Sequence, residues 1–258
     1  MTKRASLPIA VFDSGMGGIS VLRELYKLMP YEDYLFFGDS ANAPYGGRPV
    51  EQVRSLTMDR VAQLLDMGAK AVVVACNTAT SAAIVSLREK YPTIPMIGLE
   101  PAIKPAAVQN PGGRVLILAT ELTVNQPKCR LLMERYERTA TLIPLSAPGL
   151  MEFVERDLLH TDELDAFLRR LLAPYIENPV DAVVLGCTHY PFLRDDIAKV
   201  LGGKVKFYDG GAGTARETHY LLEQDAILND YTHKGQIHFM NSDPSGKSLE
   251  LSKRLFQL

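Results

Sequence analysis

Two cysteines in this chain occupy the same local pattern. Cys76 follows the apolar run 71–75 and Cys187 follows the apolar run 182–186, and small polar residues come directly after each thiol. Such apolar runs predict buried parallel strands, whose carboxyl ends are the places where α/β proteins bind ligands. A thiol has a reference pKa of about 8.5, so one member of a pair can be thiolate while the other is thiol. The pair therefore predicts a site with two faces, one accepting a proton and one donating it.

Helical patterns follow both cysteines, at 81–91 and at 192–201. Each sulfur is thus expected near the N-terminus of a helix, where the helix dipole favours a thiolate. The two patterns are separated by roughly the length of a small domain, which is too far for one supersecondary motif. We therefore expect two half-molecules of similar build.

Strand and helix patterns alternate along the chain, which predicts an α/β fold. We expect two pseudo-symmetric doubly wound domains whose parallel central sheets face each other across an active-site cleft. The first domain is expected to comprise residues 1–99 plus 210–258, and the second residues 100–209. Residues 209–213, rich in glycine, are expected to form a flexible turn. Strands are expected at 9–12, 34–37, 71–75, 96–99, 115–118, 141–144, 182–185, 205–208 and 237–240, and helices at 19–28, 50–67, 81–91, 125–136, 161–176, 192–201, 214–228 and 248–256.

Composition restricts the class of partner. The net charge is −2 and the sequence pI is about 6.2, and no lysine or arginine cluster is present, so a nucleic acid partner is not expected and a small-molecule substrate is favoured. No apolar run approaches the length of a membrane span, and no membrane association is expected. The cysteine count is three, an odd number that favours free thiols in a reducing compartment. We expect a cytoplasmic protein.

Other ligand motifs are incomplete. The glycines at 15–18 lack the spacing of a dinucleotide-binding loop, and the segment 245–248 lacks the first glycine of a phosphate-binding loop. The sequence contains no Cys-x-x-Cys pair, and its histidines do not have the spacing of a zinc site. We expect neither a metal nor a nicotinamide cofactor.

Four ordered motifs carry a family resemblance. They are Asp13-Ser-Gly-x-Gly-Gly18, Gly38-Asp39-Ser40 with Pro44-Tyr45-Gly46, Ala75-Cys76-Asn77-Thr78-Ala79-Thr80, and Gly186-Cys187-Thr188-His189-Tyr190-Pro191. With them the chain resembles the glutamate racemases of the aspartate/glutamate racemase superfamily from Ile9 to about Glu217, and only in general character beyond. The resemblance implies cofactor-independent interconversion of L- and D-glutamate, supplying D-glutamate for peptidoglycan, by a protein that is often a homodimer. No pyridoxal lysine is then required.

The resemblance also implies a role for individual residues. Cys76 would deprotonate the D-enantiomer and Cys187 the L-enantiomer, with Asp13 beside the first thiol and His189 beside the second. Asp39 and Glu155 match further acid–base residues, although Glu152 is a rival for Glu155. Matches to substrate-binding positions are Asp13, Ser14, Pro44, Tyr45, Gly46, Cys76, Asn77, Thr78, Thr120, Thr123, Cys187, Thr188 and His189.

Simpler interpretations exist for each residue. A cysteine at the end of a buried strand is often a small core residue, and Cys129 has no motif that argues otherwise. Asp13 can serve as a helix N-cap, and Asp39 and Glu155 can be caps or surface carboxylates. Two other functions also remain: a racemase acting on aspartate or hydantoins, and a regulatory binding protein, for example one that acts on DNA gyrase.

Overall fold

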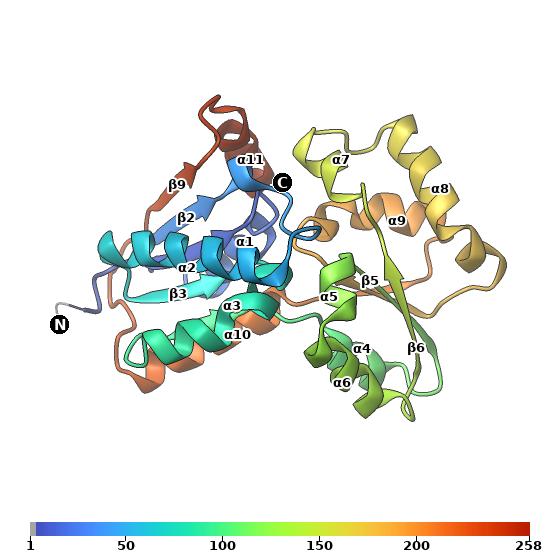
Figure 1. Ribbon diagram of the computed structural model, residues 1–258, viewed down its shortest axis with the longest axis horizontal. Helices are drawn as coiled ribbons and strands as arrows, with labels where there is room; N and C mark the ends of the chain where they lie inside the picture. Colours follow the sequence, from blue (N-terminus) through green and yellow to red (C-terminus); the bar gives the residue numbers. More distant parts are fainter. Residues whose placement is uncertain (1–3) are drawn as a thin grey trace. The chain divides into compact units, whose positions relative to one another are not determined.

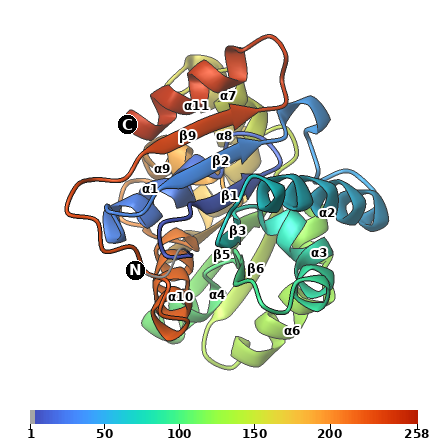
Figure 2. The same ribbon diagram turned by 90° about the vertical axis from the view of Figure 1, so that its left-hand side faces the viewer.

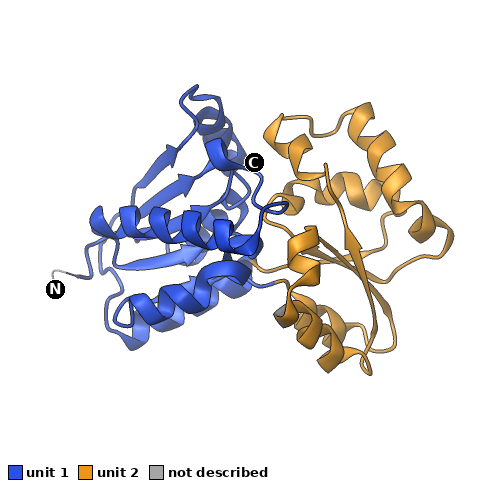
Figure 3. Ribbon diagram, in the orientation of Figure 1, with its two compact units in different colours: residues 1–100, 211–258 blue, residues 101–210 orange. Residues whose placement is uncertain are grey.

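The computed structural model describes residues 4–258, which form alternating strands and helices (Figures 1 and 2). The chain divides into two compact units (Figure 3). The first unit extends to Glu100 and resumes at Gly211, and the second comprises Pro101–Gly210. None of the helices in the described part of the chain is long and apolar enough to cross a membrane.

The first unit contains a five-stranded parallel sheet in the order β4-β3-β1-β2-β9 (Figure 2). The central strand β1 is buried along its whole length, because helices cover both faces of the sheet. Its strands are β1 (Ile9–Asp13), β2 (Tyr34–Gly38), β3 (Ala71–Val74), β4 (Met96–Gly98) and β9 (Ile237–Asn241). Its helices are α1 (Ile19–Leu28), α2 (Val50–Asp66), α3 (Asn77–Lys90), α10 (Gly211–Gln224) and α11 (Lys247–Gln257), with a 3₁₀ turn η1 (Ser40–Asn42).

Alternate residues of these strands enter different cores. Phe12 and Val74 lie in the same buried cluster as Val61 and Leu64 of α2 and Leu87 of α3. Helices α1, α10 and α11 pack on the opposite face, where α1 contacts both of the others. Because successive side chains of a strand point to opposite faces, a doubly covered sheet requires the continuous apolar runs seen in this sequence.

The second unit has a four-stranded parallel sheet in the order β6-β5-β7-β8. Pro144 lies inside β6, which is an edge strand, the place where a missing N–H donor is tolerated. The strands are β5 (Arg114–Ala119), β6 (Thr141–Ser146), β7 (Ala182–Gly186) and β8 (Lys206–Asp209). The helices are α4 (Ile103–Gln109), α5 (Glu121–Asn125), α6 (Pro127–Tyr136), α7 (Met151–Glu155), α8 (Asp162–Glu177) and α9 (Arg194–Val200), with a 3₁₀ turn η2 (Tyr190–Leu193).

The two sheets share one strand order. The first four strands of the first unit lie in the order β2-β1-β3-β4, and the four strands of the second unit lie in the matching order β6-β5-β7-β8. The first unit has one additional strand, β9, beside β2. Strands β3 and β7, which precede the two matching cysteines, are therefore equivalent in topology. The prediction of an α/β fold with two parallel sheets is confirmed.

Several element boundaries differ from the sequence prediction. The flexible turn expected at 209–213 is wrong, since α10 already begins at Gly211, which is buried. Packing of α10 against α1 overrides the low helix propensity of these glycines. Helix α3 begins at Asn77, four residues before the predicted start. Helices α4, α5 and α7 were not predicted, because elements of seven residues or fewer show little periodicity.

Candidate active site

Cys76 caps the helix that follows its strand. Its sulfur accepts a hydrogen bond from the backbone N–H of Ala79 at 3.4 Å, and its backbone is extended, so α3 begins at the next residue. The hydroxyl of Ser14 lies 3.4 Å from the same sulfur. An N–H donor and the positive end of a helix both favour negative charge on this buried thiol. The structure thus gives Cys76 the environment that the sequence predicted.

Asp13 ends the neighbouring strand β1. It is fully buried, and its Oδ1 accepts a hydrogen bond from the backbone N–H of Gly15 at 2.7 Å. A Cβ at Gly18 would lie 2.7 Å from the Cβ of Asp13 and 3.2 Å from that of Ala75, so only glycine fits there. The glycines after β1 therefore allow the turn to pack closely against Asp13 and the strand that leads to Cys76.

Asp39, which follows β2, is the acceptor in a buried polar cluster. Its carboxylate accepts hydrogen bonds from the hydroxyl of Tyr45 at 2.7 Å and from Nδ2 of Asn42 at 3.1 Å, and Nε of Arg60 lies 3.4 Å away. Burial alone would raise the pKa of Asp39, but the hydrogen bonds from Tyr45, Ser242 and Asn42, together with Arg60, hold it below the usual value. Asp39 is therefore an anion that orients Tyr45.

Tyr45 remains a hydrogen-bond donor. Burial, the hydrogen bond to Asp39 and the nearby Cys76 all raise the pKa of Tyr45 far above its usual range. Its ring is buried in the same cluster as Phe12 and Cys76. Of its neighbours, Pro44 is exposed and Gly46 half-buried. The loop thus presents a protonated phenol close to the first thiol.

Cys187 belongs to a chain of three side chains in the second unit. Its sulfur lies 3.6 Å from Nδ1 of His189, whose Nε2 lies 3.0 Å from Oε1 of Glu155. The thiol and the imidazole are buried, and Glu155 is partly buried at the end of α7. Glu152 is exposed on the same short helix. The structure therefore places Glu155, not its rival, against the imidazole.

His189 is held in its charged form by its two neighbours. Burial would lower the pKa of His189, but the hydrogen bonds and charges of Cys187 and Glu155 raise it well above the usual value. The expected helix N-terminus near Cys187 is displaced, because the 3₁₀ turn η2 intervenes and α9 begins only at Arg194. The imidazolium, rather than a helix dipole, is thus the positive group beside this sulfur.

The remaining predicted residues lie at the same strand ends. Ala119 of β5 pairs with Gly186 of β7, so Thr120 and Cys187 follow adjacent positions of neighbouring strands. The hydroxyl of Thr120 caps α5 and donates a hydrogen bond to Oγ1 of Thr123 at 2.9 Å. Asn77, Thr78, Thr123 and Thr188 are all buried. Among the described residues, none donates a hydrogen bond to the buried Oδ1 of Asn77.

Sequence reasoning missed several members of these clusters. Arg60 and Asn42 reach Asp39 from α2 and from the turn η1, and no motif marks either residue. Ser242 reaches the same carboxylate from the far end of the chain. Within residues 4–258, no group of three or more His, Cys, Asp or Glu is placed to hold a metal ion.

Comparison with known proteins shows which family the chain belongs to. The model of the Asp/Glu/Hydantoin racemase family matches residues 30–218. The chain belongs to this family. A glutamate racemase of Clostridium perfringens (strain SM101 / Type A) is 46% identical over 251 residues, which are 97% of this chain and 96% of that protein.

Solved structures of family members agree with the fold. Glutamate racemase RacE1 of Bacillus anthracis superimposes with a TM-score of 0.87 at 30% identity, over 98% of this chain and 94% of that chain. Escherichia coli glutamate racemase, in complex with L-glutamate and the activator UDP-MurNAc-Ala, gives a TM-score of 0.85 at 32% identity, over 96% and 95% of the two chains. These three members of the Asp/Glu/hydantoin racemase family, each matched over nearly its whole length, are glutamate racemases.

Proposed function

We propose that this chain is a glutamate racemase that inverts the α-carbon by proton transfer between two thiols, with no cofactor. The observation that carries the proposal is the duplicated thiol. Cys76 and Cys187 follow topologically equivalent strands in the two units, and each has its own polar partners. The 46% sequence identity to a glutamate racemase, over 97% of this chain, supports glutamate as the substrate.

The chemistry requires one base and one acid. A thiolate removes the α-proton from one face of the amino acid, which leaves a carbanion, and the thiol on the opposite face returns a proton to that carbon. In this proposal Cys187 accepts the proton of L-glutamate and Cys76 that of D-glutamate, and the thiols exchange roles when the substrate has the opposite hand.

The two faces stabilise the thiolate by different means. Beside Cys187, the charged imidazole of His189 is kept in place by Glu155. Beside Cys76, the stabilising groups are the N–H of Ala79 and the hydroxyl of Ser14. Asp13, Asp39 and Tyr45 complete the first face, while Asn77, Thr78, Thr120, Thr123 and Thr188 supply hydroxyl and amide groups for the substrate carboxylates and ammonium.

Circular dichroism tests the substrate. We expect the signal of L-glutamate to decay to zero when purified protein is added without any cofactor, and the signal of D-glutamate to decay likewise. L-aspartate is the matched control and should keep its signal, since its carboxylate is one methylene closer to the α-carbon. Decay with aspartate and none with glutamate would refute glutamate as the substrate.

The proposal includes a cellular setting. The D-glutamate formed would supply peptidoglycan synthesis in the cytoplasm, and all three cysteines are free thiols, as a reducing compartment requires. We also propose a homodimer, for which the mass of the protein in solution is the test. A monomer mass at high concentration would refute the dimer.

A further inference from the structure

The last strand of the first sheet lies outside the segment that the family model matches. That match ends at residue 218, whereas β9 comprises Ile237–Asn241. β9 nevertheless pairs in parallel with β2, and Asn241 is in register with Gly38, the residue before Asp39. Figure 2 shows β9 beside β2. The end of β9 therefore lies where the loop of Asp39 and Tyr45 begins.

Two side chains at the end of β9 bind this loop. Ser242 Oγ accepts a hydrogen bond from the backbone N–H of Ala41 at 3.0 Å, and its own N–H donates to the carbonyl of Gly38 at 2.9 Å. Asn241 Nδ2 donates to the hydroxyl of Ser40 at 2.9 Å. The turn η1, which follows Asp39, is thus held by both residues.

The Ser242 hydroxyl can bridge two groups at once. A hydroxyl donates one hydrogen bond while it accepts another, so Ser242 can accept from Ala41 and donate to the carboxylate of Asp39. Asp39 in turn accepts from Tyr45 at 2.7 Å. Asp39 is therefore the single residue that links Ser242 to the phenol of Tyr45.

Close packing leaves this junction little freedom. A Cβ at Gly38 would overlap the carbonyl oxygen of Gly15 and lie 2.7 Å from Asn241 Nδ2. The loop after β1, the loop after β2 and the end of β9 thus meet at Gly38. Movement of one of them has to displace the others.

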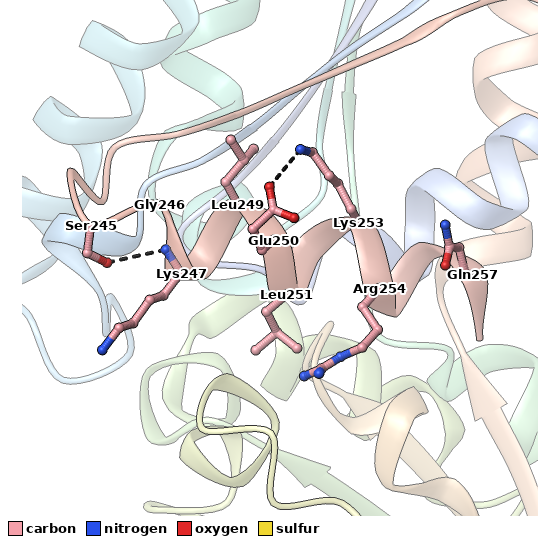
Figure 4. A pocket seen from close by; sticks show the side chains of 9 residues that line it. All are labelled: Ser245, Gly246, Lys247, Leu249, Glu250, Leu251, Lys253, Arg254 and Gln257. Carbon is pink, nitrogen blue, oxygen red and sulfur yellow. Dashed lines mark hydrogen bonds and ion pairs between the residues drawn. The ribbon is translucent and has the colours of Figure 1, made fainter.

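The segment that continues to α11 is joined to Asn241 by its backbone, since the N–H of Asp243 donates to Oδ1 of Asn241 at 2.8 Å, but the side chain of Asp243 has other partners. The carboxylate of Asp243 accepts hydrogen bonds from Ser245 and from Ser248 in the first turn of α11, and these bonds hold the pKa of Asp243 well below its usual value. A cavity of about 850 Å³ is lined by residues of the segment 245–257, and Figure 4 shows their side chains along α11. The Asp243 side chain therefore stabilises the helix start, and its hydrogen-bond partners are Ser245 and Ser248 rather than residues of the Asp39 loop, which makes a side-chain substitution here a suitable control.

We propose that Ser242 and Asn241 are positioning residues for the substrate loop of the first thiol face. They fix the turn at Ser40–Asn42, and through it the orientation of Asp39 and Tyr45 toward the substrate. The inference rests on the proposed racemase activity and assigns part of the site to the terminal strand, beyond the segment matched by the family model.

The test compares Ser242→Ala, Ser242→Thr and Asp243→Asn in the full chain. The alanine variant leaves the N–H of Ala41 without its acceptor, so we expect the KM for both enantiomers of glutamate to rise about five- to tenfold while kcat stays close to that of the wild type. The threonine variant keeps a hydroxyl and should restore KM. The Asp243→Asn variant should lower the melting temperature with KM unchanged.

Amide hydrogen exchange gives a second readout that needs no substrate. The Ala41 amide should exchange faster in Ser242→Ala than in wild type or in Asp243→Asn. A KM in Ser242→Ala no higher than in Asp243→Asn, or no rescue by threonine, would overturn the inference. A wild-type chain that fails to racemise glutamate would instead refute the proposed function. The exchange rate of the Ala41 amide would then be the remaining test of whether Ser242 holds the turn at Ser40–Asn42.

Discussion

Replacement of either active-site thiol by serine is expected to lower racemisation about a thousandfold or more in both directions. The hydroxyl of serine stays protonated at neutral pH and is a very poor base in that form. Each conversion of one enantiomer into the other needs both thiols, one as the base and one as the acid. The two enantiomers have equal free energy in water, so kcat/KM must fall equally in both directions for any variant. Racemisation rates alone therefore cannot say which thiol serves which enantiomer.

A β-chloro analogue of glutamate separates the two faces. Once a base removes its α-proton, chloride leaves from the β-carbon, and no second protein group is needed. Cys76→Ser should still eliminate chloride from the L-analogue, because Cys187 is intact, and Cys187→Ser from the D-analogue. Chloride release is the measurement. Chloride elimination from both enantiomers of the analogue by either variant would contradict the assignment of one thiol to each enantiomer.

Cys129 provides the matched control. It is a buried thiol on α6, in the apolar cluster of the second unit, where burial raises its pKa. Cys129→Ser makes the same atomic change away from the proposed site, so its racemisation should equal that of the wild type. A comparable loss in this variant would show that the effect of the other two substitutions is structural.

Loss of the His189 imidazole should act on one face only. We expect His189→Asn to lower elimination from the L-analogue about a hundredfold and to leave elimination from the D-analogue close to wild type. The reason is that His189 lies 3.6 Å from the sulfur of Cys187 and supplies the positive charge beside it. Equal losses with both analogues would contradict a role confined to this face.

Glu155 tunes the same face through the imidazole. Because the carboxylate of Glu155 helps to raise the pKa of His189, Glu155→Gln should lower that pKa. The imidazolium is lost as pH rises, so elimination from the L-analogue should decline at lower pH in Glu155→Gln than in wild type. Glu152→Gln, one helical turn earlier and exposed, is the control and should leave the pH profile unchanged.

The sequence predicted the parts of the site that depend on local pattern. The apolar runs before Cys76 and Cys187 predicted parallel strands, and the carboxyl ends of parallel strands predicted where the thiols lie. Resemblance to a known family then selected His189 and Glu155. The contact of Glu155 with His189 joins α7 to the loop after β7, and its distance of 3.0 Å required the structure.

Other parts of the site arise only from tertiary packing. Arg60 and Ser242 reach Asp39 from a long helix and from the terminal strand, and neither position has a distinctive neighbour in the sequence. The early start of α10 follows from its packing on α1, against the local preference of its glycines. A hydrophobic pattern of period two or 3.6 indicates which face of a strand or helix is buried. It does not indicate which distant residue contacts that face.

Racemisation in heavy water tests the two-base claim most directly. With two thiols, the proton removed from L-glutamate stays on one sulfur, and the D-glutamate formed receives a deuteron from the other, which has exchanged with solvent. Early in the reaction, mass spectrometry of the separated enantiomers should therefore find deuterium in nearly all of the D-glutamate and little in the remaining L-glutamate. Deuterium entering both enantiomers at equal rates, or D-glutamate that keeps the original proton, would contradict the two-thiol mechanism.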